Sequence, residues 1–372
     1  MAGEDRSWRR YLLWPLLKGC GLIYGSITHL RNQLYRHGYL KCYWPGCYVI
    51  SVGNITVGGT GKTPVVAVLA KALAKGGRKV AIISRGYKAK KPSLRFRLSH
   101  GGDWSTSRVV SDGREILLTP RLAGDEPYML AKNLPGVIVI TDTNRVRGAR
   151  LAMREFGVDT IILDDGMQHL KMKRQRDIVL LDSTCPFGYE RILPGGLLRE
   201  PLSGLKRADQ IILTKAENLT KERKQEITEE IRYYNKRADI LTCHYVPDSL
   251  RSVVTDREVP LDLLQALPVM VVSGIAQPQG FCKLLEANGA KIVGRRLFPD
   301  HHRFTRDEIK SVYSDANALG AQAVLMTEKD AVRFPKKALG EDGVPVYYLK
   351  VSVDFGVSQE DFTHSIESIC RG

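Results

Sequence analysis

The loop Gly58-Gly59-Thr60-Gly61-Lys62-Thr63 constrains this chain more than any other feature. It follows an apolar run, Cys47–Val52, and precedes a segment of helical spacing that opens near Pro64. This order of strand, glycine loop and helix is the context of a P-loop, in which backbone amides and the helix start hold phosphate oxygens. Lys62 is expected to contact the β- and γ-phosphates, and Thr63 to place its hydroxyl on Mg²⁺. The sequence therefore predicts a site for a nucleoside triphosphate.

The loop departs from the strict P-loop pattern at one position. That pattern has glycine at position 56, where this chain has threonine, and the adjacent glycines 58 and 59 make the loop a variant. A glycine-rich turn with an incidental Lys-Thr pair is the alternative. The strand and helix on either side favour nucleotide binding. The residues expected to line the nucleotide here are Thr56, Gly58, Gly59, Thr60, Gly61, Lys62 and Thr63.

Short runs rich in Val and Ile alternate with longer segments of helical spacing after residue 45. Such alternation indicates a mostly parallel sheet covered on both faces, with ligands beyond the carboxyl ends of the strands. We therefore expect an α/β fold with a P-loop NTPase-like, mostly parallel sheet flanked by helices. The expected strands are Cys47–Val52, Lys79–Ser84, Val137–Thr141, Thr160–Leu163, Ile178–Asp182 and Gln210–Thr214, and the expected helices include Pro64–Lys75, Arg145–Phe156 and Lys221–Arg237.

A second series of strands and helices follows, and 372 residues suffice for two domains. We expect an N-terminal amphipathic helical segment over 1–40, a P-loop core domain over 41–205, and a smaller α/β domain over 206–372 that closes over the nucleotide. Pro247–Leu267, which has weak periodicity and several charges, is a candidate linker. The expected strands are Leu241–Val246, Val269–Ser273, Ala323–Met326 and Val344–Val351, with helices near Gln279–Asn288 and Thr305–Leu319.

Two adjacent aspartates, Asp164 and Asp165, follow the apolar strand Thr160–Leu163. A P-loop enzyme places the partner of its Mg²⁺ at such a strand end. Because neighbouring side chains on an extended backbone point to opposite sides, one carboxylate can meet the metal while the other meets it through water or holds Lys62. His169 could fix this loop or touch phosphate. An acidic turn after a strand is the alternative.

Two further segments carry side chains that can move a proton. Asp125 precedes the helical segment Tyr128–Lys132 and could accept a proton from an attacking hydroxyl, or could simply cap that helix. His301 and His302 precede a helix near Thr305. Adjacent histidines are a weak metal signature, whereas one histidine can carry a proton or orient a base. A purely structural role for this segment is the alternative.

Arginines after expected strands are candidates for phosphate contacts, because a guanidinium group binds phosphate through two parallel hydrogen bonds. Arg145 follows Asn144, and Arg199 stands in the segment Leu198-Arg199-Glu200-Pro201. Each is a weak signal alone, since most arginines are simply solvated.

The chain is strongly basic, with 56 Lys and Arg residues against 40 Asp and Glu and a formal net charge of +16. Such a surface favours anionic partners, whether nucleic acid, a phosphorylated substrate or an acidic membrane face. The basic residues are spread along the chain, and there is no zinc-finger or RNA-binding aromatic signature. We therefore expect no nucleic acid partner.

Residues 6–40 combine basic, aromatic and apolar side chains. The uncharged run between Lys18 and Arg31 is too short to span a bilayer, which needs roughly 20 apolar residues, and no signal-peptide cleavage site follows it. One interpretation is a helix that lies on an anionic membrane with its apolar side down. The other is a helix packed on the protein's own core. Pro15 is expected to start or kink this helix.

Seven motifs in order give the sequence a resemblance to one enzyme family. They are Gly53–Pro64, Ser84–Tyr87, Gly124–Pro127, Asp164–His169, Leu193–Pro201, Phe298–His302 and Thr327–Ala331. Together they resemble the tetraacyldisaccharide 4'-kinase family of Gram-negative bacteria over nearly the whole chain. The phosphate loop alone is unspecific, whereas the ordered set is highly specific. Met167 stands where the family usually has an aromatic residue, which we interpret as a change in packing.

The resemblance implies transfer of the γ-phosphate of ATP to the 4'-hydroxyl of tetraacyldisaccharide 1-phosphate, giving lipid IVA in lipid A biosynthesis. It also implies Mg²⁺ and a peripheral or monotopic location at the cytoplasmic face of the inner membrane, where the enzyme would meet its membrane-embedded substrate. In this sequence the implied hydroxyl-activating pair is Asp125 with His301. The implied phosphate contacts are Lys62, Thr63 and Arg145, and the implied metal residues are Thr63, Asp164, Asp165 and Glu200.

Two other classes of protein stay open from the residues alone. A nucleotide-dependent switch or chaperone can carry a double-glycine loop of this kind, but it needs no base that activates a hydroxyl. A nucleic-acid-binding ATPase is suggested only by the net charge.

Overall fold

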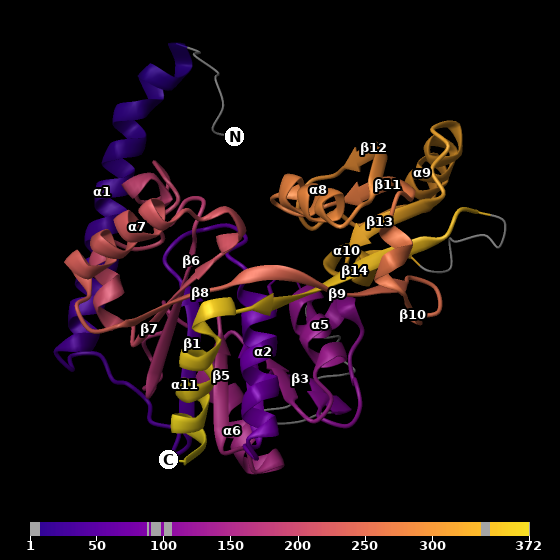
Figure 1. Ribbon diagram of the computed structural model, residues 1–372. Coiled ribbons are helices and arrows are strands. Elements are labelled where there is room, and N and C mark those ends of the chain that lie inside the picture. Colours follow the sequence, from indigo (N-terminus) through magenta and orange to yellow (C-terminus); the bar gives the residue numbers. More distant parts are fainter. Residues whose placement is uncertain (1–7, 88, 91–97, 100–105, 336–342, 372) are drawn as a thin grey trace. The chain divides into compact units, whose positions relative to one another are not determined.

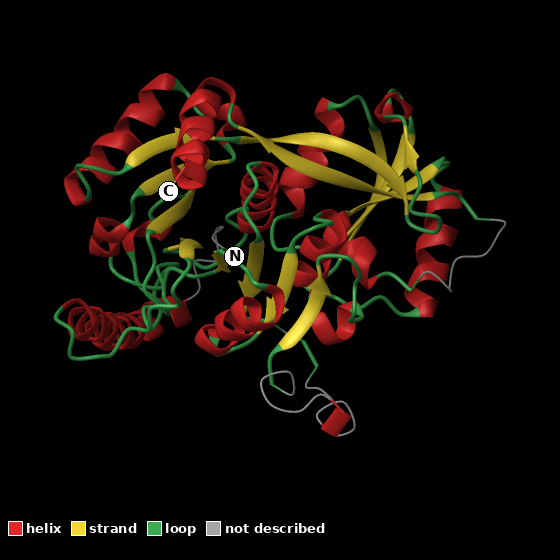
Figure 2. Ribbon diagram, turned by 90° about the horizontal axis from the view of Figure 1, so that it is seen from below, coloured by secondary structure: helices red, strands yellow, loops and turns green. Residues whose placement is uncertain are grey.

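The computed structural model describes residues 8–87, 89–90, 98–99, 106–335 and 343–371. Within it the chain forms two compact units, each assembled from separate stretches of sequence (Figure 1). Unit 1 comprises residues 1–85, 142–244 and 355–372, and unit 2 comprises residues 86–141 and 245–354. Figure 2 shows strands bordered by helices in each unit, which confirms the expected α/β class.

Six strands of unit 1 lie in the order β2-β5-β1-β6-β7-β8, and every pairing among them is parallel. In all of them except the edge strand β8 the side chains are buried almost throughout, because helices cover a parallel sheet on both faces. The expectation of a mostly parallel sheet is therefore confirmed. The strands are β1 (Tyr48–Asn54), β2 (Val80–Ser84), β5 (Thr160–Asp164), β6 (Arg176–Asp182), β7 (Gln210–Thr214) and β8 (Asp239–Thr242).

The helices of unit 1 begin and end close to the expected positions. The helix after the phosphate loop starts two residues earlier than expected, and Pro15 lies inside the first helix rather than at its start. They are α1 (Trp8–Arg36), α2 (Lys62–Lys75), α6 (Arg145–Phe156), α7 (Lys221–Tyr234) and α11 (Gln359–Arg371), with short 3-10 turns η2 (Gly188–Glu190), η3 (Leu202–Arg207), η4 (Ala216–Asn218) and η7 (Gly356–Ser358).

The sheet of unit 2 has the strand order β10-β9-β14-β13-β11-β12, and its central pairs are parallel. Alternate side chains of β11 and β13 enter two different clusters, one with α9 and one with α8, so helices cover both faces of this sheet. The elements are β9 (His244–Ser252), β10 (Glu258–Val259), η5 (Leu261–Leu264), β11 (Pro268–Ser273), α8 (Pro278–Ala287), β12 (Lys291–Leu297), α9 (Arg306–Ala318), β13 (Ala323–Thr327), α10 (Glu328–Arg333) and β14 (Val346–Asp354).

The segment 86–141 also belongs to unit 2. It contains an antiparallel strand pair and two helices in its described part. These are β3 (Arg108–Asp112), α4 (Pro120–Ala123), α5 (Asp125–Asn133) and β4 (Ile138–Thr141).

This division differs from the contiguous domains 41–205 and 206–372 expected from the sequence. The boundary expected after residue 205 falls inside η3, because β7 continues the first sheet beside β6. The candidate linker Pro247–Leu267 instead supplies most of β9, all of β10 and η5. Local sequence patterns find strands, whereas membership of a unit depends on pairing between distant strands.

Candidate functional site

The phosphate loop leaves β1 at Asn54 and ends at Gly61, which has the left-handed conformation φ 76°, ψ 25° directly before α2. Glycine adopts this conformation without steric cost, so Gly61 allows the turn into the helix. The side-chain amide of Asn54 donates to the carbonyl of Thr56 at 2.7 Å and to the hydroxyl of Thr60 at 3.0 Å. Asn54, which was quoted only within the motif Gly53–Pro64, therefore holds the loop that it precedes.

Thr56 accounts for the departure from the strict glycine pattern. It is buried, and its backbone forms an antiparallel bridge with Leu198. A Cβ atom on Gly188 would lie 2.9 Å from the Thr56 methyl group, so the two residues are closely packed. The threonine therefore fills space beneath the loop, where a glycine would leave a gap.

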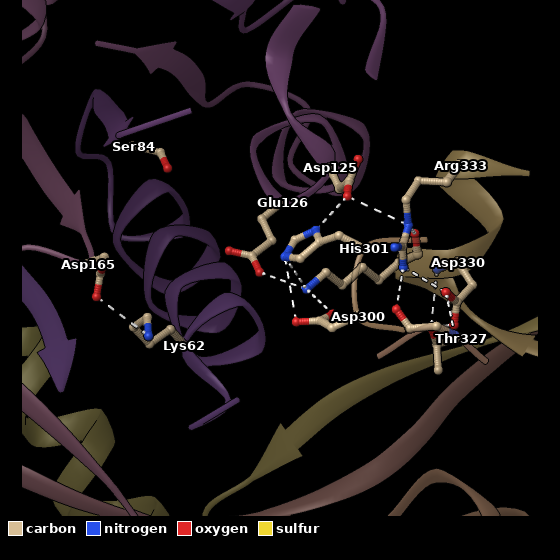
Figure 3. Close-up of polar contacts among 12 residues, drawn as sticks. Lys62, Ser84, Asp125, Glu126, Asp165, Asp300, His301, Thr327, Asp330 and Arg333 are labelled. Carbon is tan, nitrogen blue, oxygen red and sulfur yellow. Dashed lines mark hydrogen bonds and ion pairs between the residues drawn. The ribbon is translucent and has the colours of Figure 1, made fainter. Parts of the chain in front are cut away.

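Lys62 lies at the first position of α2 and reaches the carboxyl end of β5. Its Nζ atom is 3.5 Å from Oδ1 of Asp165 and donates to Oδ1 of Asn54 at 3.3 Å (Figure 3). Arg199 donates to both oxygens of Asp165 at 2.9 Å. Burial raises the pKa of the Asp165 carboxyl, but the charges of Lys62 and Arg199 outweigh it and hold the pKa below its ordinary value. Asp165 is therefore a charged carboxylate that positions the lysine.

Asp164 lies at the end of β5 and is 3% exposed. It accepts a hydrogen bond from the hydroxyl of Ser84 at 2.8 Å. Ser84 ends β2, the strand that pairs with β5. The carboxyl ends of three neighbouring strands thus supply Ser84, Asp164 and the phosphate loop at one edge of the sheet.

Arg145 begins α6 and is only 6% exposed, yet its Nε atom has no hydrogen-bond partner. Burial lowers the pKa of its guanidinium, and the nearby charges of Asp165 and Asp164 act against that shift. Arginine remains charged even so. A buried cation with an unpartnered N–H group fits an anionic ligand, which would complete its hydrogen bonds.

His169 lies in the same region and stays neutral at pH 7. Burial and the positive charges of Arg145 and Arg174 lower its pKa to about 4. Its Nε2 atom is buried without a hydrogen-bond partner. The imidazole therefore adds no charge to the site.

Glu200 is 2% exposed, and its two oxygens are engaged by other side chains. Oε1 accepts from Gln168 at 2.9 Å, and Oε2 accepts from Arg207 at 2.7 Å and from Asn32 of α1 at 3.2 Å. These contacts join α1, the loop after β5 and η3. Glu200 is thus a structural connection, and a metal role would require one of these contacts to be exchanged.

The oxygen donors at this sheet edge fit Mg²⁺ rather than a transition metal. The described residues contain no group of three or more His, Cys, Asp or Glu side chains placed to hold a metal. Mg²⁺ commonly takes only one or two carboxylates, with substrate phosphates and waters completing its octahedron. Asp164, Asp165 and the Thr63 hydroxyl are of the required kind.

A second cluster of sequence-predicted residues lies in unit 2. Nδ1 of His301 is 3.0 Å from Oδ2 of Asp125, and Nε of Arg333 is 3.6 Å from the same oxygen (Figure 3). Burial raises the pKa of Asp125, but the hydrogen bond from His301 and the charge of Arg333 outweigh it, so the pKa lies below its ordinary value. Because Asp125 is a carboxylate and can only accept, Nδ1 of His301 must donate.

The surrounding turn holds His301 in an unusual backbone conformation, with φ of 64°. Its amide donates to the carbonyl of Gly274 at 3.0 Å, and the amide of Gly274 donates to Asp330 at 3.0 Å. Arg333 donates to Asp330 at 2.6 Å and to the Gly274 carbonyl at 3.2 Å. A left-handed non-glycine residue persists only where its surroundings fix it, and such residues cluster at functional sites.

His302 has a different role from its neighbour. Its ring stacks on Phe298 with centroids 4.6 Å apart, and its Nε2 atom lies 3.0 Å from both carboxylate oxygens of Glu308. Glu308 also forms the capping box of α9 with Thr305. The structural interpretation of the histidine pair therefore holds for His302, whereas His301 contacts Asp125.

Sequence reasoning assigned no role to Lys329, Asp330 or Arg333 of α10, although the segment Thr327–Ala331 was among the motifs that carry the resemblance. Ser84 was likewise quoted only within a motif. The available signal was position along the chain, since Ser84 ends β2 and α10 follows β13 directly. Asp125 is the first residue of α5, whose N-cap is Gly124 without a side-chain capping hydrogen bond. The Asp125 side chain bonds His301 instead, so the capping alternative is wrong.

The N-terminal segment forms α1, whose faces differ in their packing. Gly21 and Gly25 are buried, and Cβ atoms on them would lie 3.3 Å and 2.9 Å from atoms of Ile192, so this face packs on unit 1. Ile23, Ile27 and Leu30 form an apolar stripe on another face, and they are 64%, 60% and 60% exposed. The side chains of residues 8–14 and 16 lie outside the described part. Among the helices that the structure describes, none has the length and apolar character needed to cross a bilayer.

Comparison with known proteins gives one consistent family. Residues 10–371 match the family model described as tetraacyldisaccharide-1-P 4'-kinase. The tetraacyldisaccharide 4'-kinase of Halothermothrix orenii is 40% identical over 344 residues, covering 89% of this chain and 86% of that protein. The one from Anaeromyxobacter sp. (strain K) is 40% identical over 340 residues, covering 90% and 86%. The crystal structure of LpxK from Aquifex aeolicus in complex with ATP shares 31% identity and a TM-score of 0.72, covering 97% of this chain and 99% of that one.

Proposed function

We propose a role in the reaction for each site residue of this chain, which belongs to the tetraacyldisaccharide 4'-kinase family. The chain is an ATP-dependent kinase that phosphorylates the 4' position of the tetraacyldisaccharide 1-phosphate in lipid A synthesis. The product of that transfer is lipid IVA. The hydrogen bond between Asp125 and His301 is the observation that carries the proposed mechanism, because a nucleotide switch needs no such pair.

The ATP half of the proposed site lies in unit 1. The loop amides, Lys62 and Arg145 bind the phosphates, and Asp165 keeps Lys62 extended toward them. Thr63, Asp164 and Asp165 would hold Mg²⁺, with Glu200 as a further candidate. When bound, Mg²⁺ supplies neutralisation of the charge that develops on the phosphates.

The acceptor half lies in unit 2. The oxygen of the 4'-hydroxyl forms a bond to the γ-phosphorus, and the bond from that phosphorus to the oxygen that bridges the β- and γ-phosphates breaks. The hydroxyl proton passes to the Asp125 carboxylate. Since the pKa of Asp125 is low, it first orients the hydroxyl and accepts the proton late, as suits a loose transition state. Closure of the second unit over bound ATP is part of this proposal.

Replacement of Arg145 by methionine tests the phosphate half of the site. We expect ATP affinity to fall roughly 10- to 150-fold, because a charge-assisted hydrogen bond to phosphate contributes about 1.5–3 kcal/mol. The melting temperature should not fall, since the guanidinium is buried with an unpartnered Nε in the free protein. Calorimetric ATP titration and thermal melting measure both quantities. Unchanged ATP affinity, or loss of stability with intact affinity, would make Arg145 a structural residue.

We propose that the exposed stripe of α1 binds the cytoplasmic face of the inner membrane and holds the enzyme there as a peripheral or monotopic protein. The chain's charge of +16 suits an anionic bilayer, and a tetraacylated substrate stays in the membrane. Each isoleucine that enters the lipid contributes about 1.5–3 kcal/mol.

The double variant Ile23→Gln/Ile27→Gln should therefore lower partition onto vesicles of anionic phospholipid by roughly 10-fold or more. Both residues are exposed, so the fold should survive. Tyr233→Gln, which changes a 78% exposed aromatic residue on α7, is the matched control. Equal sedimentation of the double variant and the wild type with vesicles would refute the α1 surface.

One assay tests the function itself. The full chain is incubated with ATP labelled at the γ-phosphate and with tetraacyldisaccharide 1-phosphate in mixed micelles. Labelled lipid carrying phosphate at the 4' position is the expected product. Release of free phosphate alone would favour the switch or chaperone alternative, and stimulation of hydrolysis by DNA or RNA but not by lipid would favour a nucleic-acid-binding ATPase.

A further inference from the structure

Lys329, in the first turn of α10, has a place in the acceptor site that the proposed reaction does not use. Its Nζ atom lies 3.3 Å from Nε2 of His301 and 3.3 Å from Oε1 of Glu126. It is also 3.6 Å from Oδ1 of Asp300. In Figure 3 its three partners, Glu126, Asp300 and His301, lie beside one another. The side chain is 20% exposed, so the ammonium group is held largely inside the cluster.

The contact between Lys329 and His301 determines where the imidazole carries its proton. A lysine ammonium group has three donors and no acceptor, so Nε2 must offer its lone pair. The ring proton of a neutral imidazole is then on Nδ1, from which it is donated to Asp125 at 3.0 Å. The two contacts together define one direction of hydrogen bonding, from Lys329 through His301 to Asp125.

The opposite tautomer, with the ring proton on Nε2, would also have an acceptor nearby. Oδ2 of Asp300 lies 3.8 Å from Nε2 of His301 and would accept a proton placed there. Lys329 is closer to Nε2, at 3.3 Å, and it also pairs with the other oxygen of Asp300, Oδ1, at 3.6 Å. The other groups that face this cluster are Arg333, whose contact is with Asp125, and the ring of Tyr87, whose centroid is 5.8 Å from that of His301.

We propose that Lys329 is a positioning residue that keeps the ring proton of His301 on Nδ1, so that the imidazole keeps Asp125 oriented for the acceptor hydroxyl. The effect of Lys329 on catalysis rests on the proposed roles of Asp125 and His301. The tautomer itself is a property of the free enzyme. His301 and Arg333 both contact Oδ2 of Asp125. In this arrangement Oδ1 receives the hydroxyl proton.

The test compares Lys329→Met with Lys329→Arg in the full chain. Methionine keeps the length of the side chain but cannot donate, whereas arginine, which has donors only, should keep the tautomer. Lys310→Met, at an exposed position of α9, is the matched control. Side-chain ¹⁵N NMR of the histidines, with His301 assigned from the His301→Gln spectrum, reports which ring nitrogen is protonated.

We expect Nδ1–H at His301 in the wild type, Lys329→Arg and Lys310→Met, and a shift toward Nε2–H in Lys329→Met. With the lipid substrate, kcat of Lys329→Met should fall about 10-fold with KM for ATP within about twofold, and the acid limb of its pH profile should move to higher pH. Lys329→Arg should restore most of kcat. Thermal melting checks that each variant is folded.

Two results would overturn the proposal. One is an unchanged Nδ1–H tautomer in Lys329→Met. The other is a raised KM for the lipid with unchanged kcat, which would make Lys329 a direct substrate contact. Because the NMR measurement needs no substrate, a wild-type enzyme that fails to phosphorylate the lipid would remove the proposed function without deciding the tautomer.

Discussion

Replacing Asp125 with asparagine is expected to lower kcat by about 10²- to 10⁴-fold, the range for loss of a general base, and to leave KM for ATP within about threefold. The carboxylate is charged at neutral pH, since its pKa lies below the ordinary value. Asparagine preserves the shape and the acceptor for His301, but it removes the charge and the ability to take up a proton. The loss should therefore fall on the chemical step.

The same substitution should leave the fold intact. Arg333 loses a carboxylate at 3.6 Å but keeps Asp330 at 2.6 Å, so its charge stays paired. Asp262→Asn, at an exposed position of η5, is the matched control. Steady-state phosphorylation of the lipid and thermal melting of both variants give the comparison. Turnover of Asp125→Asn close to that of the wild type would remove Asp125 from the role of base.

The phosphate site could be predicted because its parts are local in sequence. Continuous apolar runs mark the buried strands, and the loop follows β1 directly. The aspartate pair follows β5, the strand beside β1. Met167 is 1% exposed and packs closely over Gly53, where an added Cβ would lie 2.6 Å from the Met167 Cβ atom, which fits the interpretation of this departure as a change in packing.

The acceptor site could be predicted only in part, because its contacts join distant parts of the chain. Asp125 and His301 are 176 positions apart, and only the family resemblance paired them. His301 and His302 look alike in sequence, and the fold alone separates the one that contacts Asp125 from the one that stacks on Phe298. Lys329 is one of 56 Lys and Arg residues, and its proposed role follows only from its contact with the His301 imidazole in the fold.

The largest effect in the phosphate half is expected from Lys62→Met. Its ammonium group is 13% exposed at the first position of α2 and is fixed by Asn54 and Asp165 at 3.3 Å and 3.5 Å. Such a preorganised charge stabilises the transferring phosphoryl group without reorganisation, and removing one such group costs about 10²- to 10³-fold in kcat. Because the P-loop lysine also contacts bound ATP, kcat/KM for ATP should fall further than kcat.

The fold should tolerate this change, because Asp165 keeps two hydrogen bonds from Arg199 at 2.9 Å. Lys71→Met, at an exposed position of the same helix, is the matched control and should behave as the wild type. ATP titration measures binding, lipid phosphorylation measures turnover, and thermal melting measures stability. A kcat of Lys62→Met within about fivefold of the wild type would be a far smaller loss than removal of a preorganised charge causes. In that case the phosphate loop would bind ATP without stabilising transfer of the γ-phosphoryl group. The electrostatic part of the mechanism would then have to come from Arg145 and Mg²⁺ alone.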